Sequence, residues 1–356
     1  MQRARFVFVL TFALTLLVQG WLWTHYPYLD SSAWASATAT IRDGGYPSTA
    51  QPTFGYPGTL LILPAGAIAS FGVPPETANI IVMVVLLSLG AACIAACTHF
   101  LRPERAWWRY VTFTLAVTPF YLISTPPTAL AMLAAILVAL LTLMIRERPH
   151  PGLFLALGAA GALGFMSRFD TTAVVFGVAL LYLLVRRERG AIMAAALAGA
   201  LSILGIPMLW SGPLTYLHQV LEKIGEHTQK VSASFLALDM LTEPIVFGLL
   251  GLIAGLVAYR TRVLPRDYTL WLAATTVVGA GALLVSSHHP PWLFYPFLMP
   301  WMLLLPLFVL ELYARSAGTL RRHAALLLAV LVLGQALSLV FQVVMPVPWD
   351  AILSGP

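Results

Sequence analysis

The sequence predicts an all-helical, polytopic membrane protein with about eleven transmembrane helices and no soluble domain. Three observations lead to this prediction. Of the 356 residues, 60% are hydrophobic and only 10% are charged, whereas a soluble domain carries about 25% charged residues. The mean hydropathy is +0.86. The apolar residues fall into separate segments, and most of these approach or reach the roughly 17 to 25 residues that a helix needs to cross a bilayer core about 30 Å thick.

In chain order, the eleven apolar segments are 6–23, 79–100, 107–124, 128–145, 152–166, 171–185, 191–210, 244–259, 268–287, 292–313 and 324–345. Arg3 and Arg5 precede the first segment, and no small-residue cleavage site follows it, so we interpret this segment as a retained signal anchor. A twelfth apolar stretch, 59–71, is too short to be an ordinary span. The predicted transmembrane domain therefore covers 1–345, and 346–356 forms a short external tail.

Whether 59–71 crosses the membrane decides the side on which every later loop lies. If it does not cross, sixteen arginines share one side with the amino-terminal residues. The other side then holds only Arg42, Arg168, Lys223 and Lys230. Cytoplasmic loops carry such an excess of positive charge. We therefore predict a cytoplasmic amino terminus, a segment 59–71 that dips into or lies on the outer leaflet, and external loops at 25–78 and 211–243. A short tilted span at 59–71 is the alternative.

Two amphipathic helices are predicted in the external loops. The first starts after Asp30 and ends at Gly44-Gly45. Its apolar face consists of Trp34, Ala37, Thr38 and Ile41. The second covers about 214–230, where leucines recur at helical spacing. We expect both helices to lie at the membrane surface, beside a cavity that opens outward.

Acidic residues and histidines gather on the predicted external side, so a site built from titratable side chains is expected to face outward. The apolar segments hold almost no ionisable residue. Ion-coupled transporters usually need such residues near the membrane midplane, so this composition argues against ion-coupled transport but not against a lipid flippase. The isoelectric point of about 9.5 comes from the cytoplasmic arginines and does not indicate nucleic-acid binding.

Four sequence features together resemble the GT-C glycosyltransferases, which include protein O-mannosyltransferases, the lipid A aminoarabinose transferase and oligosaccharyltransferases. The first is Asp30, placed early in the external loop after a signal anchor. The others are Tyr56-Pro57-Gly58 before the short apolar segment, the run Ala162 to Arg168, and the run Tyr295 to Pro300. Two departures are that Asp30 is followed by Ser31, where many relatives have a second acid, and that no soluble carboxy-terminal domain is predicted.

The resemblance implies an inverting transfer of a sugar from a polyprenyl-phosphate donor to an acceptor hydroxyl of a glycan, lipid or protein. Asp30 would be the general base, and its alternative role is a helix N-cap. The phosphate leaving group needs positive charge. Arg168 is the candidate phosphate ligand, because a guanidinium matches phosphate geometry. Its alternatives are an ion pair with Asp170 or an interfacial position.

Further substrate-binding candidates are His288, His289, Asp43 and Tyr56. Asp43 precedes Gly44 and also fits a turn. No cofactor is expected, and the alternative is a divalent metal bound by Asp30 and the two histidines. The other function that the sequence leaves open is a non-enzymatic lipid-linked sugar flippase or membrane assembly subunit. The expected partners are the donor lipid, the acceptor, membrane lipids and a partner protein that helps to recognise the acceptor.

The amino-acid usage adds an expectation about location. Two lysines stand against eighteen arginines, and alanine is abundant. This usage is typical of a GC-rich genome, so we expect a bacterial plasma membrane with the active site on its external, periplasmic side.

Overall fold

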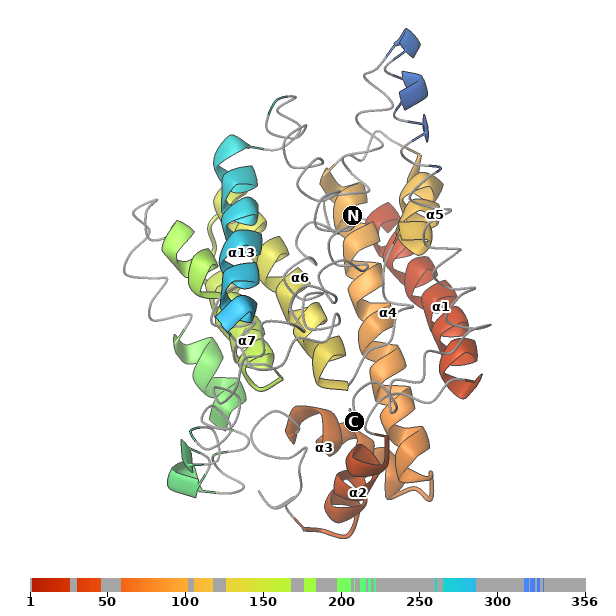
Figure 1. Cartoon of the computed structure of the whole chain (residues 1–356), viewed down its shortest axis with the longest axis vertical. Helices are drawn as coiled ribbons and strands as arrows, with labels where there is room; N and C mark the ends of the chain where they lie inside the picture. Colours follow the sequence, from red (N-terminus) through yellow and green to blue (C-terminus); the bar gives the residue numbers. More distant parts are fainter. Residues whose placement is uncertain are drawn as a thin grey trace.

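The structure is a computed structural model. It describes residues 2–25, 31–45, 59–101, 106–117, 126–167, 176–183, 197–205 and 265–285, with shorter pieces at 208, 212–215, 217–218, 221, 260, 317–319, 321–323, 325–326 and 329. Every regular element in these residues is an α-helix, which agrees with the predicted fold class. Figure 1 shows the helices side by side in a bundle, with α2 and α3 at one end.

Three helices are long and apolar enough to cross a membrane. They are α1 (Gln2–His25), α4 (Pro75–Leu101) and α6 (Pro126–Glu147). A shorter apolar helix, α7 (Pro151–Phe165), follows α6. Each of the three long helices contains a predicted apolar segment and extends past it into more polar residues. Helix α7 nearly matches the predicted segment 152–166. These helices are those of a membrane protein, and the total of eleven spans stays a prediction.

Helices α1 and α4 run in opposite directions. Val7, near the start of α1, packs with Ala95, near the end of α4, and with Val111 of α5 (Trp107–Val117). Phe6 meets Trp107 edge to face, with ring centroids 5.0 Å apart. The chain therefore leaves α1 and enters α4 at the same end of the pair.

The short helices α2 (Ser31–Arg42) and α3 (Thr59–Ala69) lie at that end, as Figure 1 shows. Helix α3 has 11 residues and is about 16 Å long at 1.5 Å per residue. It is too short to cross a bilayer core of about 30 Å. The side of the membrane on which α2 and α3 lie stays a prediction.

The largest core cluster joins α4, α6 and α7 to α13 (Arg266–Val285). The hydroxyl group of Tyr268 donates a buried hydrogen bond of 2.7 Å to the backbone oxygen of Ala139, so α13 lies directly against α6. Tyr268 also stacks at a tilt on Trp271, with ring centroids 5.1 Å apart. The Tyr268–Ala139 hydrogen bond thus joins two helices that are far apart in the sequence.

Two glycines, one on α7 and one on the helix 197–205, allow close contacts between α7 and two other helices. A Cβ atom on Gly161 would lie 2.5 Å from the ring of Phe176, which begins the helix 176–183. A Cβ atom on Gly199 would overlap the backbone oxygen of Leu155. Glycine is the residue that permits such close packing between membrane helices.

The remaining predicted elements are described only in part. Residues 176–183 are helical within the predicted segment 171–185, and 197–205 are helical within 191–210. Within the predicted second amphipathic helix, the described residues 213–215, 217–218 and 221 are helical. Its leucines are exposed rather than covered by protein, with Leu214 at 83% and Leu221 at 58%. The predicted segments 244–259 and 292–313, the tail 346–356 and most of 324–345 lie outside the described residues.

Candidate functional site

Helix α2 begins at the residue after Asp30, and its position controls where the chain can place that carboxylate. The predicted apolar face of α2 is confirmed as one face, because Trp34, Ala37, Thr38 and Ile41 are all buried. This face packs against α3 and α4. The expectation that α2 lies on the membrane surface by this face therefore needs correction, since protein rather than lipid covers it.

A buried hydrogen bond fixes α2 against α4. Thr38 Oγ1 donates to Asn79 Oδ1 at 2.9 Å. Asn79 is 2% exposed, and its Nδ2 atom has no hydrogen-bond partner in the described part of the chain. A hydrogen bond between two buried side chains sets the rotation of α2 about its axis, because any other rotation would leave both groups unpaired in an apolar setting. Sequence reasoning missed this pair. The signal was there, since Asn79 is the only asparagine of the chain and begins an apolar segment.

The end of α2 fits tightly on α3. A Cβ atom on Gly66 would overlap the Ile41 side chain, so the two helices are in close contact at this point. The prediction that α2 ends at Gly44-Gly45 is confirmed. Gly44 has a φ angle of +82°, and the amide of Gly45 donates to the oxygen of Thr40 at 2.9 Å. Glycine adopts positive φ without steric cost, which is why it ends the helix here.

Asp43 is the one predicted site residue within the described part of the chain. It is exposed, and its two carboxylate oxygens accept hydrogen bonds of 2.8 and 3.1 Å from the guanidinium of Arg42. The hydrogen bond from Arg42 lowers the pKa of Asp43 below its ordinary value. The carboxylate of Asp43 is thus hydrogen-bonded to its neighbour at a helix end, which favours the turn interpretation over a substrate contact.

The chain approaches Arg168 from a buried position. Helix α7 ends at Phe165, and the next two residues, Met166 and Ser167, are 0% and 2% exposed. Ser167 Oγ donates to the backbone oxygen of Gly164 at 2.7 Å and so closes the turn on itself. With 15 residues, α7 is about 22 Å long, which is less than the thickness of a bilayer core. If α7 starts at one membrane surface, its last residue, Phe165, therefore lies below the other.

Five predicted site residues lie outside the described residues: Asp30, Tyr56, Arg168, His288 and His289. Their juxtaposition stays a prediction. Among the residues that the structure does describe, no three histidine, cysteine, aspartate or glutamate side chains are grouped closely enough to hold a metal ion. The structure fixes the supports next to Asp30 and Arg168, which are α2 and the end of α7.

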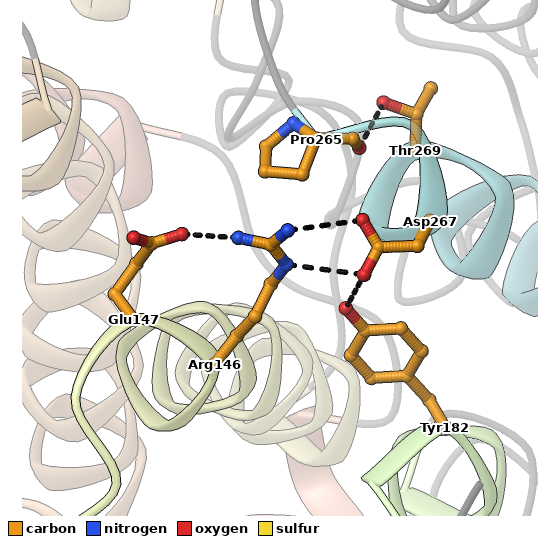
Figure 2. Close-up of polar contacts among 6 residues, drawn as sticks. All are labelled: Arg146, Glu147, Tyr182, Pro265, Asp267 and Thr269. Carbon is orange, nitrogen blue, oxygen red and sulfur yellow. Dashed lines mark hydrogen bonds and ion pairs between the residues drawn. The ribbon is translucent and has the colours of Figure 1, made fainter. Parts of the chain in front are cut away.

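A second polar cluster, shown in Figure 2, lies at the ends of three helices and was not predicted from the sequence. The guanidinium of Arg146 donates two hydrogen bonds of 3.2 Å to the carboxylate of Asp267, and Tyr182 donates a third of 2.7 Å. Arg146 also pairs with Glu147. Partial burial acts to raise the pKa of Asp267, but the hydrogen bonds from Arg146 and Tyr182 outweigh it and lower this pKa to about 2.

The position of this cluster agrees with a structural role. The predicted topology places three segment ends on the cytoplasmic side: the end of 128–145, the end of 171–185 and the start of 268–287. The cluster lies at these ends, with Arg146, Tyr182 and Asp267. Their contact agrees with the placement of these three ends on one side, and which side it is stays a prediction. The cluster ties α6, the helix 176–183 and α13 together.

The fold and these two polar regions define a class, namely an all-helical membrane protein with short helices packed against one end of its long helices. Comparison of the chain with known protein families, with curated proteins and with solved structures finds no match. The arguments for a function therefore come from the residues themselves.

Proposed function

We propose that the protein is a glycosyltransferase that moves a sugar from a polyprenyl-phosphate donor to an acceptor hydroxyl at the external face of the plasma membrane. One observation supports this proposal most. The helix that follows Asp30 is held in a single orientation by the buried Thr38–Asn79 hydrogen bond and by the close contact of Ile41 with Gly66. A general base must be held at a defined place, and a rigid support next to Asp30 meets that requirement.

Asp30 serves as the general base in this proposal. The attacking hydroxyl gives up its proton as it forms the bond to the anomeric carbon, and a carboxylate within hydrogen-bond reach can accept that proton. The bond from the anomeric carbon to the phosphate oxygen breaks on the opposite side, so the configuration of the sugar inverts. The phosphate leaves as an anion and needs no acid to protonate it.

Arg168 binds the leaving phosphate. Its charge stabilises the negative charge that develops on the phosphate oxygens, and its planar donors match two of those oxygens at once. The buried residues Met166 and Ser167, together with the short α7, support a position for Arg168 below the membrane surface. That depth suits a lipid phosphate, which lies at the boundary between the acyl chains and water.

His288, His289 and Tyr56 are proposed to contact the donor or the acceptor. Asp43 has a weaker claim, because Arg42 already engages its carboxylate. A divalent metal bound by Asp30 and the two histidines stays the alternative to a metal-free site. The acceptor is a glycan, a lipid or a protein, and either the membrane domain or a partner protein recognises it.

Mass spectrometry of membrane lipids from a deletion strain tests the proposal. Loss of the transferase should cause a polyprenyl-phosphate sugar to accumulate while the acceptor lacks that sugar. The chain supplied on a plasmid should restore both. A flippase gives a different result, because the donor would then accumulate only on the cytoplasmic leaflet. Unchanged donor and acceptor in the deletion strain would contradict the transferase.

A further inference from the structure

The end of the molecule opposite α2 and α3 carries arginines that form no ion pair with an acid of the described residues. Arg3 and Arg5 are exposed on the first turn of α1, and Arg109 lies in the first turn of α5. Within the described part of the chain, none of the three has an ion-pair partner. Arg42 and Arg146 differ in this respect, since Arg42 pairs with Asp43 and Arg146 pairs with Asp267. We call Arg3, Arg5, Arg109, Trp107 and Trp108 the basic surface.

The residues of the basic surface come together because α1 and α5 both begin at this end. Phe6 contacts Trp107 edge to face, and Arg3 lies within electrostatic range of His99 on the last turn of α4. His99 in turn contacts the Tyr110 ring, with centroids 5.6 Å apart. The amino ends of α1 and α5, which carry partial positive charge, lie here beside the carboxyl end of α4, which carries partial negative charge. In the sequence, the residues between α4 and α5 include two further arginines, Arg102 and Arg105, and one acidic residue, Glu104.

Two indole rings place this surface at the level of lipid headgroups. Trp107 is 36% exposed and Trp108 is 53% exposed, although both rings are large and apolar. Exposed tryptophans of membrane proteins lie at the boundary between acyl chains and water. The guanidinium of Arg109 lies over the Trp108 ring at 5.4 Å. This cation–π contact orders the Arg109 side chain beside the indole ring, and its N–H groups can donate hydrogen bonds to a phosphate oxygen.

His99 provides a separate indication of a polar contact at this end. The residue is 3% exposed, and its Nδ1 atom has no hydrogen-bond partner among the residues that the structure describes. Buried polar groups in proteins are nearly always hydrogen-bonded. This nitrogen, beside Arg3, therefore has hydrogen-bonding capacity that the described residues do not use, as have several other buried polar atoms of the described helices.

We propose that the basic surface binds the headgroup of an anionic phospholipid of the leaflet in which it lies. The phosphodiester contacts Arg3 and Arg109, and the acyl chains lie along Phe6 and the two indole rings. The charge is complementary, and the aromatic residues stand at the depth that a lipid phosphate occupies. This site lies at the end of the molecule away from the proposed sugar transfer and does not depend on that function.

Native mass spectrometry of the full chain in a neutral detergent tests the proposal by counting bound lipids. Phosphatidylglycerol is compared with phosphatidylcholine of the same acyl chains. The wild type should retain phosphatidylglycerol preferentially. Each arginine near an anionic lipid contributes about fivefold to binding, so Arg3→Gln with Arg109→Gln should weaken retention roughly 25-fold. Arg5 stays in place, because it helps to orient α1.

Arg148→Gln is the matched control, because Arg148 is exposed and belongs to the same predicted side but lies outside the basic surface. It should retain lipid as the wild type does. If the double variant melts early without lipid, each single variant should still show its fivefold loss. Equal retention of the two lipids, unchanged retention in the arginine variants, an equal loss in Arg148→Gln, or displacement by soluble glycerol phosphate at lipid-like concentrations would each overturn the proposal.

Discussion

Thr38 and Asn79 form a hydrogen bond of 2.9 Å between two buried side chains that are 41 positions apart. This bond joins α2, which follows Asp30, to α4, one of the three helices that are long and apolar enough to cross a membrane. The helix that follows the proposed base is thus fixed to a long helix by a buried hydrogen bond.

Thr38→Val should destabilise the protein. The substitution keeps the shape of the side chain but removes the donor, so Asn79 loses its described partner in a buried setting. The expected loss is about 1 to 2 kcal/mol of unfolding free energy, measured as a lower melting temperature in detergent. Thr40→Val is the matched control. Thr40 Oγ1 bonds only to the backbone oxygen of Ser36 in its own helix, so its variant should melt close to the wild type. Equal effects of the two variants would contradict this role of the Thr38 hydroxyl group.

Gly199→Ala should disturb the contact between its helix and α7. The added Cβ atom would overlap the backbone oxygen of Leu155 and lie 2.8 Å from the backbone nitrogen of Ala159. Backbone atoms cannot move aside as a flexible side chain can, and overpacking of this kind costs about 1 to 3 kcal/mol. Gly205→Ala, in the same helix, meets nothing within 4 Å and should leave the melting temperature unchanged or raise it. A stable Gly199→Ala variant would show that the two helices are farther apart.

The Arg146–Asp267 pair should make stability depend on acid pH. Because the pKa of Asp267 is lowered to about 2, its contribution is fully present above the unfolded value of about 3.9 and is lost as the pH falls through about 2. The Asp267 side chain is 42% exposed, so solvent screening limits the contribution to about 1 kcal/mol or less. Asp267→Asn should therefore melt earlier than the wild type at pH 6, and the difference should shrink as the pH falls from about 4 towards 2. A difference that stays constant over this range would contradict the ionised pair.

Asp43→Asn should leave most sugar transfer intact. Arg42 already holds the carboxylate of Asp43 at an exposed helix end, so the carboxylate is poorly placed to take a proton from an acceptor. Transfer by the variant, measured as glycosylated acceptor at equal membrane abundance of the protein, should resemble that of the wild type. A severe loss would assign Asp43 to the substrate site.

The sequence predicted local features well, because they depend on local patterns. The apolar period and the glycine pair gave the extent of α2, and the positions of α1, α4, α6 and α7 follow from apolar runs. The sequence did not predict which residues pack against each helix face. Nothing near Trp34 indicates that protein rather than lipid covers it, and nothing near Arg146 identifies Asp267 as its partner. Such contacts depend on how distant helices pack, and a single sequence does not contain that information. The roles of Asp30 and Arg168 stay predictions for the same reason.

The central claim is that Asp30 accepts the proton of the acceptor hydroxyl, and Asp30→Asn tests it most directly. Asparagine keeps the size and the helix-capping ability of aspartate but cannot act as a base at neutral pH. The measurement is the amount of glycosylated acceptor and of lipid-linked donor in membranes of a deletion strain that expresses the variant, with Asp43→Asn as the matched control. We expect near-complete loss of transfer, accumulation of donor and normal abundance of the protein. Transfer at the wild-type level by Asp30→Asn would contradict the claim and leave Asp30 as the cap of α2.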